Sequence, residues 1–500
     1  MANIELRRSD ASVDPYAGTV GDNGNIILSP DQAADNLNRE GFTWYDSRYG
    51  ELGGSDTTLT FGFWTAEELA RSYYVSQINE DSFFTEGDPE TFVPLTEGQV
   101  ALAREAIGLW DEVIAISIVE GDNAQDSDIT FGNSELHPAA GAWAYQPSSN
   151  DWIHDIGNEY GFYDLGRISG DVWLNTLEPS NMEPLGFQSY ARQTMIHELG
   201  HALGLSHSGD YNASDGPATY ATDAYFYQDS NQYSTMSYFL ARETGAGHID
   251  WDNFSFLLPS TPQVHDILAV QKVYGVDTTT RTGDTVYGFN STADRDVFDF
   301  ELNELPVLTI WDAGGNDTLD FSGWDSDSII DINEGAFSSG GGTGAPTLAE
   351  ARVALGDPRL NQHQLDGILA RNGSPDGMLH DNVAIAYGAK IENAVGGGGN
   401  DTIIGNSLDN RISGGGGEDR LTGGAGNDTF IFTVADGADV ITDFKSGRDE
   451  IDLSAFGGVD AGDVKFKGTT VFVNTDNVKG YDMHIVVQGD AIKMTDIVFG

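Results

Sequence analysis

One stretch decides how the first half of this chain folds: His197-Glu198-Leu199-Gly200-His201-Ala202-Leu203-Gly204-Leu205-Ser206-His207. On a helix, His197 and His201 project from one face because they are four residues apart, so their imidazoles can share one small cation. Gly204 permits the left-handed turn that ends a helix, and the chain can then bring His207 in as a third nitrogen ligand. Glu198 lies beside these residues and can hold a metal-bound water. Three neutral nitrogens with one open position are typical of a catalytic zinc site.

A chance match is the first alternative, because the short pattern H-E-x-x-H occurs in many unrelated chains. The longer pattern H-E-x-x-H-x-x-G-x-x-H fixes five positions over eleven residues, which makes coincidence rare. The remaining apolar residues, Ile196, Leu199 and Leu203, form the stripe that seats this helix in a core.

Length and charge limit the possible functions. The 500 residues suggest two or three domains, and the absence of cysteine excludes disulfides and thiolate ligands. A formal charge of −55 excludes binding to nucleic acid or an anionic membrane through the general electrostatic field. The acidity indicates both a solvated surface and an affinity for cations, since several Ca²⁺ ions cannot neutralise so many charges. We find no apolar run of 18 residues and no N-terminal signal peptide, so neither membrane insertion nor the usual export route is expected.

Periodicity places helices and strands around the histidine stretch. Residues 1–25 are expected to form a flexible leader, residues 26–277 a catalytic domain and residues 278–500 a second domain. Amphipathic spacing and capping residues predict helices at 29–37, 96–114, 189–203 and 261–274. Alternating apolar residues predict short strands at 58–63, 116–119, 128–131, 142–145 and 171–174.

The second domain carries a repeat of nine residues within 396–431, whose turns begin at Gly396, Gly405, Gly414 and Gly423. Its glycines leave backbone carbonyls bare and its aspartates add hard oxygen ligands, a combination that suits Ca²⁺. The apolar residue at the eighth position of each nine-residue unit is expected to point inward. A disordered linker would not keep that apolar residue, so we interpret the repeat as a calcium device.

Two repeat units should make one coil, so turns 18 residues apart are expected to stack and share ions. Gly397, Gly399 and Asp401 would then face Gly414, Gly416 and Asp419, and the set continues with Gly423 and Asp428. The second turn has Leu408 and Asn410 where glycine and aspartate are expected, so its site should be weaker or built differently. Residues 337–378, with a helix-like stretch at 347–371, are expected to interrupt the repeat region.

Together these features resemble the serralysins, secreted bacterial zinc endopeptidases of the metzincin clan. The motifs that carry the resemblance are the extended histidine stretch, residues 234–238, residues 282–288 and the nonapeptides. The resemblance implies an α+β metzincin catalytic domain, with a twisted, mostly parallel sheet and two long helices. An all-β parallel β-roll or β-sandwich domain would follow. It also implies one catalytic Zn²⁺ and several structural Ca²⁺ ions.

The resemblance also implies roles for individual residues. His197, His201 and His207 would bind zinc, and Glu198 would be the general base. Met236 would form the Met-turn under the metal, and Tyr238 would be an extra zinc ligand that substrate displaces. Substrate would lie extended against Ala142, Trp143, Ala144 and Tyr145. Calcium at the domain junction would be bound by Arg281, Gly283, Thr285, Asp312, Gly314 and Asp317, partly through carbonyls, with Glu392 at a further site, although Lys390 departs from the expected threonine.

Serralysins leave the cell through a type I exporter that reads the C-terminus. The end of this chain, residues 496–500, resembles that signal except for its terminal glycine. The leader would then correspond to the short propeptide of a zymogen. We therefore expect an extracellular monomer that acts on protein and peptide substrates.

Two other functions remain open from the sequence. A non-enzymatic calcium-dependent adhesin or surface protein would explain the repeat and the acidity but not the histidine stretch. A zinc hydrolase of small amides or esters would keep the metal and change the substrate. The other histidines lack partners at ligand spacing, and no metal role is expected for His137, His154, His248, His265, His363, His380 or His484.

Overall fold

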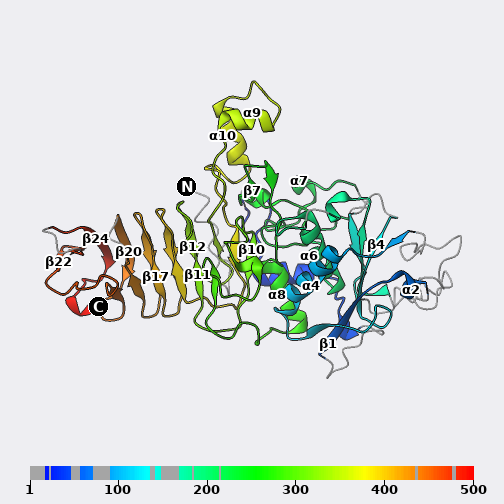
Figure 1. The fold of residues 1–500 in the computed structure, drawn as a ribbon, viewed down its shortest axis with the longest axis horizontal. Coiled ribbons are helices and arrows are strands. Elements are labelled where there is room, and N and C mark those ends of the chain that lie inside the picture. The colour runs from blue at the N-terminus through cyan, green and yellow to red at the C-terminus, as the bar shows by residue number, and fades with distance from the viewer. Residues whose placement is uncertain are drawn as a thin grey trace.

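The computed structural model shows an elongated molecule in which a helix-rich half adjoins a stack of short strands (Figure 1). It describes residues 17–21, 24–46, 57–70, 91–135, 141–147, 168–182, 185–212, 216–433, 437–475 and 480–500. Within these ranges no helix is long and apolar enough to cross a membrane.

The helix-rich half is built on a sheet whose strands run in the order β3-β1-β4-β6-β5, with β2 paired to β4. Strands β1, β3, β4 and β6 are parallel neighbours, whereas β5 runs antiparallel to β6 and lies at the end of this order. The strands are β1 (Thr58–Phe63), β2 (Phe92–Val93), β3 (Ser117–Glu120), β4 (Ile129–Ser134), β5 (Ala142–Ala144) and β6 (Asp171–Asn175). The five strands predicted for this half are thereby confirmed.

Helices pack against this sheet and against each other. The capping box of Thr96 and Gln99 begins α4, and the indole nitrogen of Trp110 donates to the Ile196 carbonyl at 3.1 Å, which ties α4 to α6. The helices of this half are α1 (Pro30–Leu37), α2 (Ala66–Leu69), α4 (Glu97–Asp111), α6 (Tyr190–Ala202), α7 (Tyr220–Asp223) and α8 (Val264–Tyr274). A short hairpin of β7 (Ile249–Asp250) and β8 (Ser255–Phe256) precedes α8.

The second half consists mainly of two seven-stranded sheets. One has the order β25-β21-β19-β17-β15-β11-β9 and the other β12-β16-β18-β20-β24-β23-β22. Most neighbours are parallel, and β22, β23 and β24 are antiparallel. The strands are β9 (Val286–Gly288), β11 (Thr318–Asp320), β12 (Ile329–Asp331), β15 (Asn393–Val395), β16 (Thr402–Ile404), β17 (Arg411–Ser413), β18 (Arg420–Thr422), β19 (Thr429–Ile431), β20 (Ala438–Phe444), β21 (Glu450–Asp452), β22 (Val464–Lys467), β23 (Thr470–Val473), β24 (Met483–Gly489) and β25 (Ile497–Val498).

The nonapeptides stack as their period predicts. Thr402 pairs with Arg420 in one sheet, and Asn393 pairs with Arg411 in the other, so partners are 18 residues apart. The apolar eighth positions are fully buried between the sheets: Ile403, Ile412, Leu421 and Phe430. The expected coil of two repeat units is confirmed.

The expected interruption at 337–378 begins later than predicted. β13 (Phe337–Ser338) is not part of it, because this strand pairs with β14 (Val383–Ile385) in a sheet that also holds β10 (Leu308–Ile310). Beyond β13 the chain forms α9 (Leu348–Ala354) and α10 (Gln362–Arg371), which project from the side of the molecule (Figure 1). The helices predicted at 347–371 are present, but as two short helices rather than one.

A separate hydrophobic cluster fastens these two helices to the first half of the chain. Trp251, from the β7–β8 hairpin, is 2% exposed and packs in the cluster of α9 and α10, which includes Ala351 and Leu365. Its indole nitrogen donates to Ser374 Oγ at 3.0 Å. Ile249 of the same hairpin is buried in this cluster too, so the projecting lobe is held through apolar side chains of the β7–β8 hairpin.

Part of the expected leader is packed against the protein. Gly18 and Ile27 are joined by a backbone hydrogen bond of 2.7 Å, and Val20 forms an antiparallel bridge with Ile26. The Tyr227 amide donates to the Ile26 carbonyl at 2.7 Å. This contact continues the folded part of the chain to residue 18, and residues 1–16 lie outside the described residues. The boundaries of the leader and of the two domains stay predictions.

Replacing Trp251 with alanine should loosen the projecting lobe. Loss of a buried tryptophan from a small cluster costs about 3–5 kcal/mol, and the cluster that holds Trp251 also holds the apolar side chains of α9 and α10. Hydrogen exchange of 348–371 should accelerate strongly in Trp251→Ala. The matched control is Val353→Ala on α9, where the side chain is 83% exposed and the exchange should not change. Equal exchange rates in both variants would contradict this account.

Candidate metal centre and catalytic site

Helix α6 and the turn after it position the three histidines of the motif. His197 and His201 lie one turn apart on α6, which ends at Ala202. Gly204 has a φ of +99°, and a β-carbon there would lie 2.1 Å from the Phe42 carbonyl oxygen, so a side chain is excluded. The left-handed turn returns the chain and brings His207 back beside the helix.

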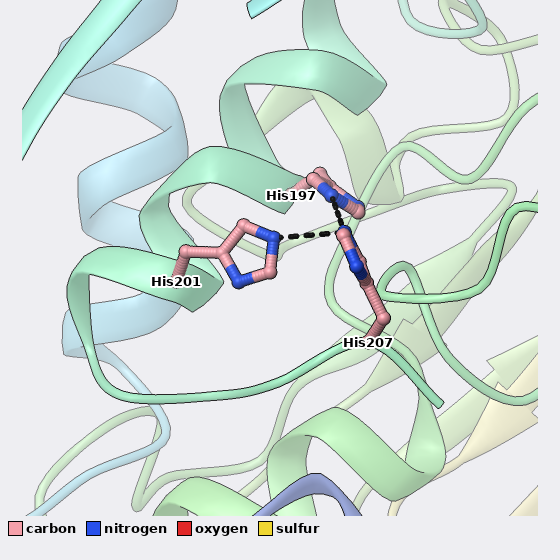
Figure 2. Close-up of side chains that lie close together, drawn as sticks. All are labelled: His197, His201 and His207. Atoms are coloured by element: carbon pink, nitrogen blue, oxygen red, sulfur yellow. Dashed lines mark hydrogen bonds between the residues drawn. The ribbon is translucent and has the colours of Figure 1, made fainter. Parts of the chain in front are cut away.

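The three imidazoles point toward one another (Figure 2). Nε2 of His207 lies 3.2 Å from Nε2 of His197 and 3.0 Å from Nε2 of His201. One ligand atom from each of the three residues lies within 4.8 Å of the others, and no further group of this kind occurs in the described ranges. His137 and His154 fall outside those ranges, and His380 contacts Asp376 instead, at 2.8 Å.

The other nitrogen of each ring is used by a backbone carbonyl. Nδ1 of His197 contacts the Thr235 carbonyl at 2.7 Å, Nδ1 of His201 the Leu205 carbonyl at 2.7 Å, and Nδ1 of His207 the Tyr211 carbonyl at 2.9 Å. A carbonyl only accepts, so each Nδ1 carries the proton and each Nε2 presents a lone pair.

Burial keeps the three rings neutral. It lowers the pKa of His197 to about 4 and that of His201 to about 3, and it lowers the pKa of His207 well below the ordinary value. Three lone pairs cannot hydrogen-bond one another at these distances. The donor set therefore fits a cation that accepts neutral nitrogen ligands, such as Zn²⁺.

Glu198 is buried next to the metal-binding histidines. Burial raises the pKa of its carboxyl to about 8, and its Oε2 atom has no hydrogen-bond partner among the described residues. A buried carboxyl with an unused oxygen is suited to hold or move a proton, especially when a bound cation lowers its pKa.

Met236 and Tyr238 lie on two sides of the histidines. Met236 is fully buried, and its Sδ atom would lie 2.5 Å from a β-carbon on Gly200, so it packs directly beneath α6. The Tyr238 ring lies 4.6 Å from the His207 ring and 6.0 Å from the His197 ring, between centroids, and the side chain is 39% exposed. Both residues lie next to the histidines, and their roles stay predictions.

Two buried carboxylates accept hydrogen bonds from the segments around the site. Neither of them was predicted from the sequence. Asp266 accepts from the Ser234 hydroxyl, the Thr235 amide and the Gln263 amide at 2.6–2.8 Å, which fixes the turn that carries the Thr235 carbonyl. Asp229 accepts from the Tyr211 hydroxyl at 2.8 Å. An acid among the apolar residues of α8 was the sequence signal for Asp266. No spacing rule connects Tyr211 with Asp229.

The predicted substrate strand lies at the edge of the sheet and beside a hollow. In β5, Trp143 pairs antiparallel with Trp173 of β6, and no described strand pairs with the opposite edge. A hollow of about 370 Å³ is lined by Ala144, Gln146 and two of the histidines, His201 and His207. Tyr145 follows β5, and its amide donates to the Asp171 carbonyl.

Three of the predicted calcium ligands form a carboxylate cluster at the domain junction. Asp317 Oδ1 accepts from the Thr285 amide at 2.7 Å, and its buried Oδ2 has no partner among the described residues. Burial first, and then the charges of Asp312 and Glu392, raise the pKa of Asp317 to about 7. The Gly283 carbonyl and Asp317 Oδ1 both lie within 2.6 Å of the position a β-carbon would take on Gly315.

The side chain of Arg281 cannot serve as a calcium ligand, unlike the carboxylates predicted beside it. Its guanidinium forms ion pairs with Glu112 and Asp294, both at 2.8 Å, so only its carbonyl is available for a metal. Its backbone has a φ of +49°, which is uncommon for arginine. The Gly314 amide donates to Asp312 Oδ1 at 2.8 Å.

The repeat turns form rows of aspartates and glycine carbonyls. The Asp401 amide donates to Asp419 Oδ1 at 2.9 Å, and the Gly416 amide donates to the Gly397 carbonyl at 2.8 Å. Burial raises the pKa of Asp401 to about 6. The remaining predicted residues, Gly399, Gly414 and Gly423, lie in the same turns.

Asp428 shares this pattern and the second turn departs from it. Burial, with the nearby charges of Asp449 and Asp443, raises the pKa of Asp428 to about 6, and its buried Oδ2 has no partner among the described residues. In the second turn the side-chain amide nitrogen of Asn410, Nδ2, donates to the Glu392 carbonyl at 3.0 Å. A neutral side chain with a donor group thus stands where the other turns have an anionic carboxylate.

In the metal-free protein, the contribution of Asp317, Asp401 and Asp428 to the free energy of unfolding should decrease as pH rises from about 4 to about 8. Their native pKa values are about 7, 6 and 6, above the ordinary 3.8, so the native state binds more protons at these groups in this window. Their contribution is complete below about pH 4 and is lost through about pH 6–7. The buried histidines have lowered pKa values and act in the opposite direction, so the quantity to measure is the difference in stability between wild type and Asp317→Asn, from urea unfolding in excess chelator. The stability of wild type relative to Asp317→Asn should fall as pH rises, and a difference that does not change with pH would contradict the assignment.

Comparison with known proteins agrees with this geometry. A family described as "Peptidase M10 serralysin C terminal" matches residues 276–355 and 359–499, and so includes most of residues 337–378, the segment that we expected to interrupt the repeat region. Metalloprotease AprA of Pseudomonas entomophila is 37% identical over 451 residues, which cover 87% of this chain and 78% of that protein.

Two further relatives carry the family name. Serralysin G of Dickeya chrysanthemi is 34% identical over 483 residues, 92% of this chain and 85% of that protein. A serralysin of Photorhabdus laumondii is 38% identical over 394 residues, 75% of this chain and 70% of that protein. These likenesses give no support to the adhesin alternative. The chain belongs to the serralysin family and is a secreted zinc-dependent metalloendopeptidase.

Proposed function

We propose that His197, His201 and His207 bind the catalytic zinc through Nε2. The observation that supports this most directly is that all three Nδ1 atoms contact carbonyls, which leaves three converging lone pairs. Bound zinc would supply a Lewis acid and a water of lowered pKa. The first half of the chain would then be a metzincin catalytic domain.

Glu198 is the proposed general base. Its unpartnered Oε2 atom accepts a proton from the attacking water and returns it to the leaving amine. Tyr238, whose ring adjoins that of His207, is placed to donate a hydrogen bond to the oxygen of the tetrahedral intermediate. Its side chain is 39% exposed, so a bound substrate can reach it.

An extended peptide is the proposed substrate. The free edge of β5 offers backbone donors and acceptors from Ala142 to Ala144, which suits main-chain hydrogen bonding to a strand-like ligand. The hollow beside Ala144 can receive a substrate side chain. A small amide or ester would not use this edge, so a peptide substrate is favoured over the small amides or esters of the alternative zinc hydrolase.

The second half is proposed to be a calcium-binding β-roll. The orphaned carboxylate oxygens of Asp317 and Asp428, together with their raised pKa values, support cation sites at the junction and in the repeat turns. Hard oxygen donors of this kind suit Ca²⁺. Bound cations would remove the repulsion that stacking imposes on the carboxylates.

Maturation and export complete the proposal. We infer a leader that is removed as a propeptide, export through a type I secretion system that reads the C-terminal region, and a monomeric enzyme outside the cell. The resemblance of residues 496–500 to the signal read by that system supports this route.

Replacing Glu198 with glutamine should abolish turnover but preserve the metal site. Glutamine has nearly the same shape and cannot accept the proton, so kcat on a peptide substrate should fall about a thousandfold. Bound zinc, measured by metal analysis, should stay at one per chain. Glu120→Gln, at an exposed ion pair with Arg104, is the matched control and should keep full activity. Substantial proteolysis by Glu198→Gln would refute the assigned base.

Calcium removal should unfold the second half at pH 8. Without cations the ionised aspartates repel, and each turn buries little apolar surface, so folding there is coupled to binding. The circular-dichroism signal of β structure should decrease in a calcium-selective chelator and return with added Ca²⁺. A spectrum that the chelator leaves unchanged would argue against a calcium-dependent roll.

A further inference from the structure

The N-terminal helix α1 and the residues after it lie along the loop that carries the third histidine. The Ser206 amide donates to the Leu37 carbonyl at 2.8 Å, and Asn36 Nδ2 donates to the Ser208 carbonyl at 2.6 Å. Residues on both sides of His207 are thus bound by a segment that precedes them by about 170 positions. Helix α6 itself supplies none of these contacts.

Arg39 makes the contact closest to the ligand. Its Nη1 atom donates to the carbonyl of His207 at 2.5 Å, and its Nη2 atom donates to the carbonyl of Gly209 at 3.2 Å. The same Nη1 atom also donates to the Asn36 carbonyl at 3.0 Å. A guanidinium is planar and presents its donors in a fixed fork, so it fixes the two peptide groups relative to each other.

We propose that Arg39 is a positioning residue for zinc binding and catalysis, which holds the backbone of His207 so that its imidazole meets those of His197 and His201. His207 is the ligand that needs such support, because it lies beyond Gly204 in an irregular loop, whereas the other two are fixed by α6. The Nδ1 contact of His207 orients its ring but leaves its peptide group free. This inference rests on the proposed zinc ligands.

A simple surface ion pair is the competing explanation. Arg39 Nη2 lies 3.6 Å from Asp210, whose side chain is 70% exposed, and an exposed pair of this length contributes little. The two carbonyl contacts are shorter and the arginine side chain is 27% exposed, so the backbone contacts dominate. Arg39 also lines the hollow beside the histidines, so a role in substrate binding has to be separated from positioning.

The test compares Arg39→Met with Arg39→Lys in the full-length, calcium-loaded protein. Arg39→Met removes the fork but keeps the chain length, so the zinc dissociation constant from chelator competition should rise about tenfold or more. The visible spectrum of the cobalt-substituted protein should change, and kcat should fall with little change in KM. Arg39→Lys keeps one donor for the His207 carbonyl, so it should recover part of the zinc affinity and of kcat.

Lys272→Met is the matched control. Lys272 also fastens α1, through Asp35 at 2.5 Å and Asp31 at 3.2 Å, but among the described residues its ammonium forms no hydrogen bond or ion pair with the histidine loop. Its removal should leave zinc affinity, the cobalt spectrum and kcat unchanged. An equal loss in this variant would show that docking of α1 in general, not Arg39, supports the ligand.

Three further outcomes would overturn the proposal. Unchanged zinc affinity and an unchanged cobalt spectrum in Arg39→Met would reject it, and so would a rise in KM alone, which marks a substrate contact. If Arg39→Met does not fold, Arg39→Lys becomes the test variant, and wild-type zinc affinity, cobalt spectrum and kcat in it would reject the proposal, because one ammonium group cannot replace the fork of donors. Failure of the zinc assignment is distinguishable, because wild-type protein would then bind no stoichiometric zinc.

Discussion

The metal centre depends on three neutral imidazoles whose Nε2 atoms are held close together inside the protein. Neutral nitrogens 3.0–3.2 Å apart gain nothing from one another, and burial prevents a proton from relieving them. The arrangement persists because three backbone carbonyls occupy the opposite sides of the rings. The fold thus maintains a cluster that is unfavourable by itself, and a bound divalent cation is the natural compensation.

The carbonyls that hold the rings come from separate parts of the chain. The Thr235 carbonyl belongs to a turn fixed by Asp266 of α8, whereas the Tyr211 carbonyl belongs to a residue whose hydroxyl donates to Asp229. Residues near position 39 brace the loop of the third histidine. The metal centre is therefore a meeting point of segments that only the complete domain brings together.

The second half also holds like ligand atoms close together, but these are carboxylate oxygens rather than imidazole nitrogens. Stacking coils 18 residues apart aligns one carboxylate above the next, as with Asp401 and Asp419. Burial raises the pKa values of Asp401 and of Asp317 because it disfavours their charged forms. A sequence with 79 acidic residues can adopt such a fold only if protons or cations balance the stacked charges.

The sequence by itself determined the elements with strong local signals. The spacing of His197, His201 and His207 specified a helix, a turn and a converging ligand set, since both helical and glycine geometry are local properties. The period of nine specified the buried positions of Ile403, Ile412, Leu421 and Phe430. Only the tertiary structure decided what lies far apart in sequence: the contact of Arg39 with the His207 loop, the support from Asp229 and Asp266, and the attachment of α9 and α10 through Trp251. These contacts join positions up to about 170 residues apart, and no periodic pattern records which polar group will meet which carbonyl once the chain is folded.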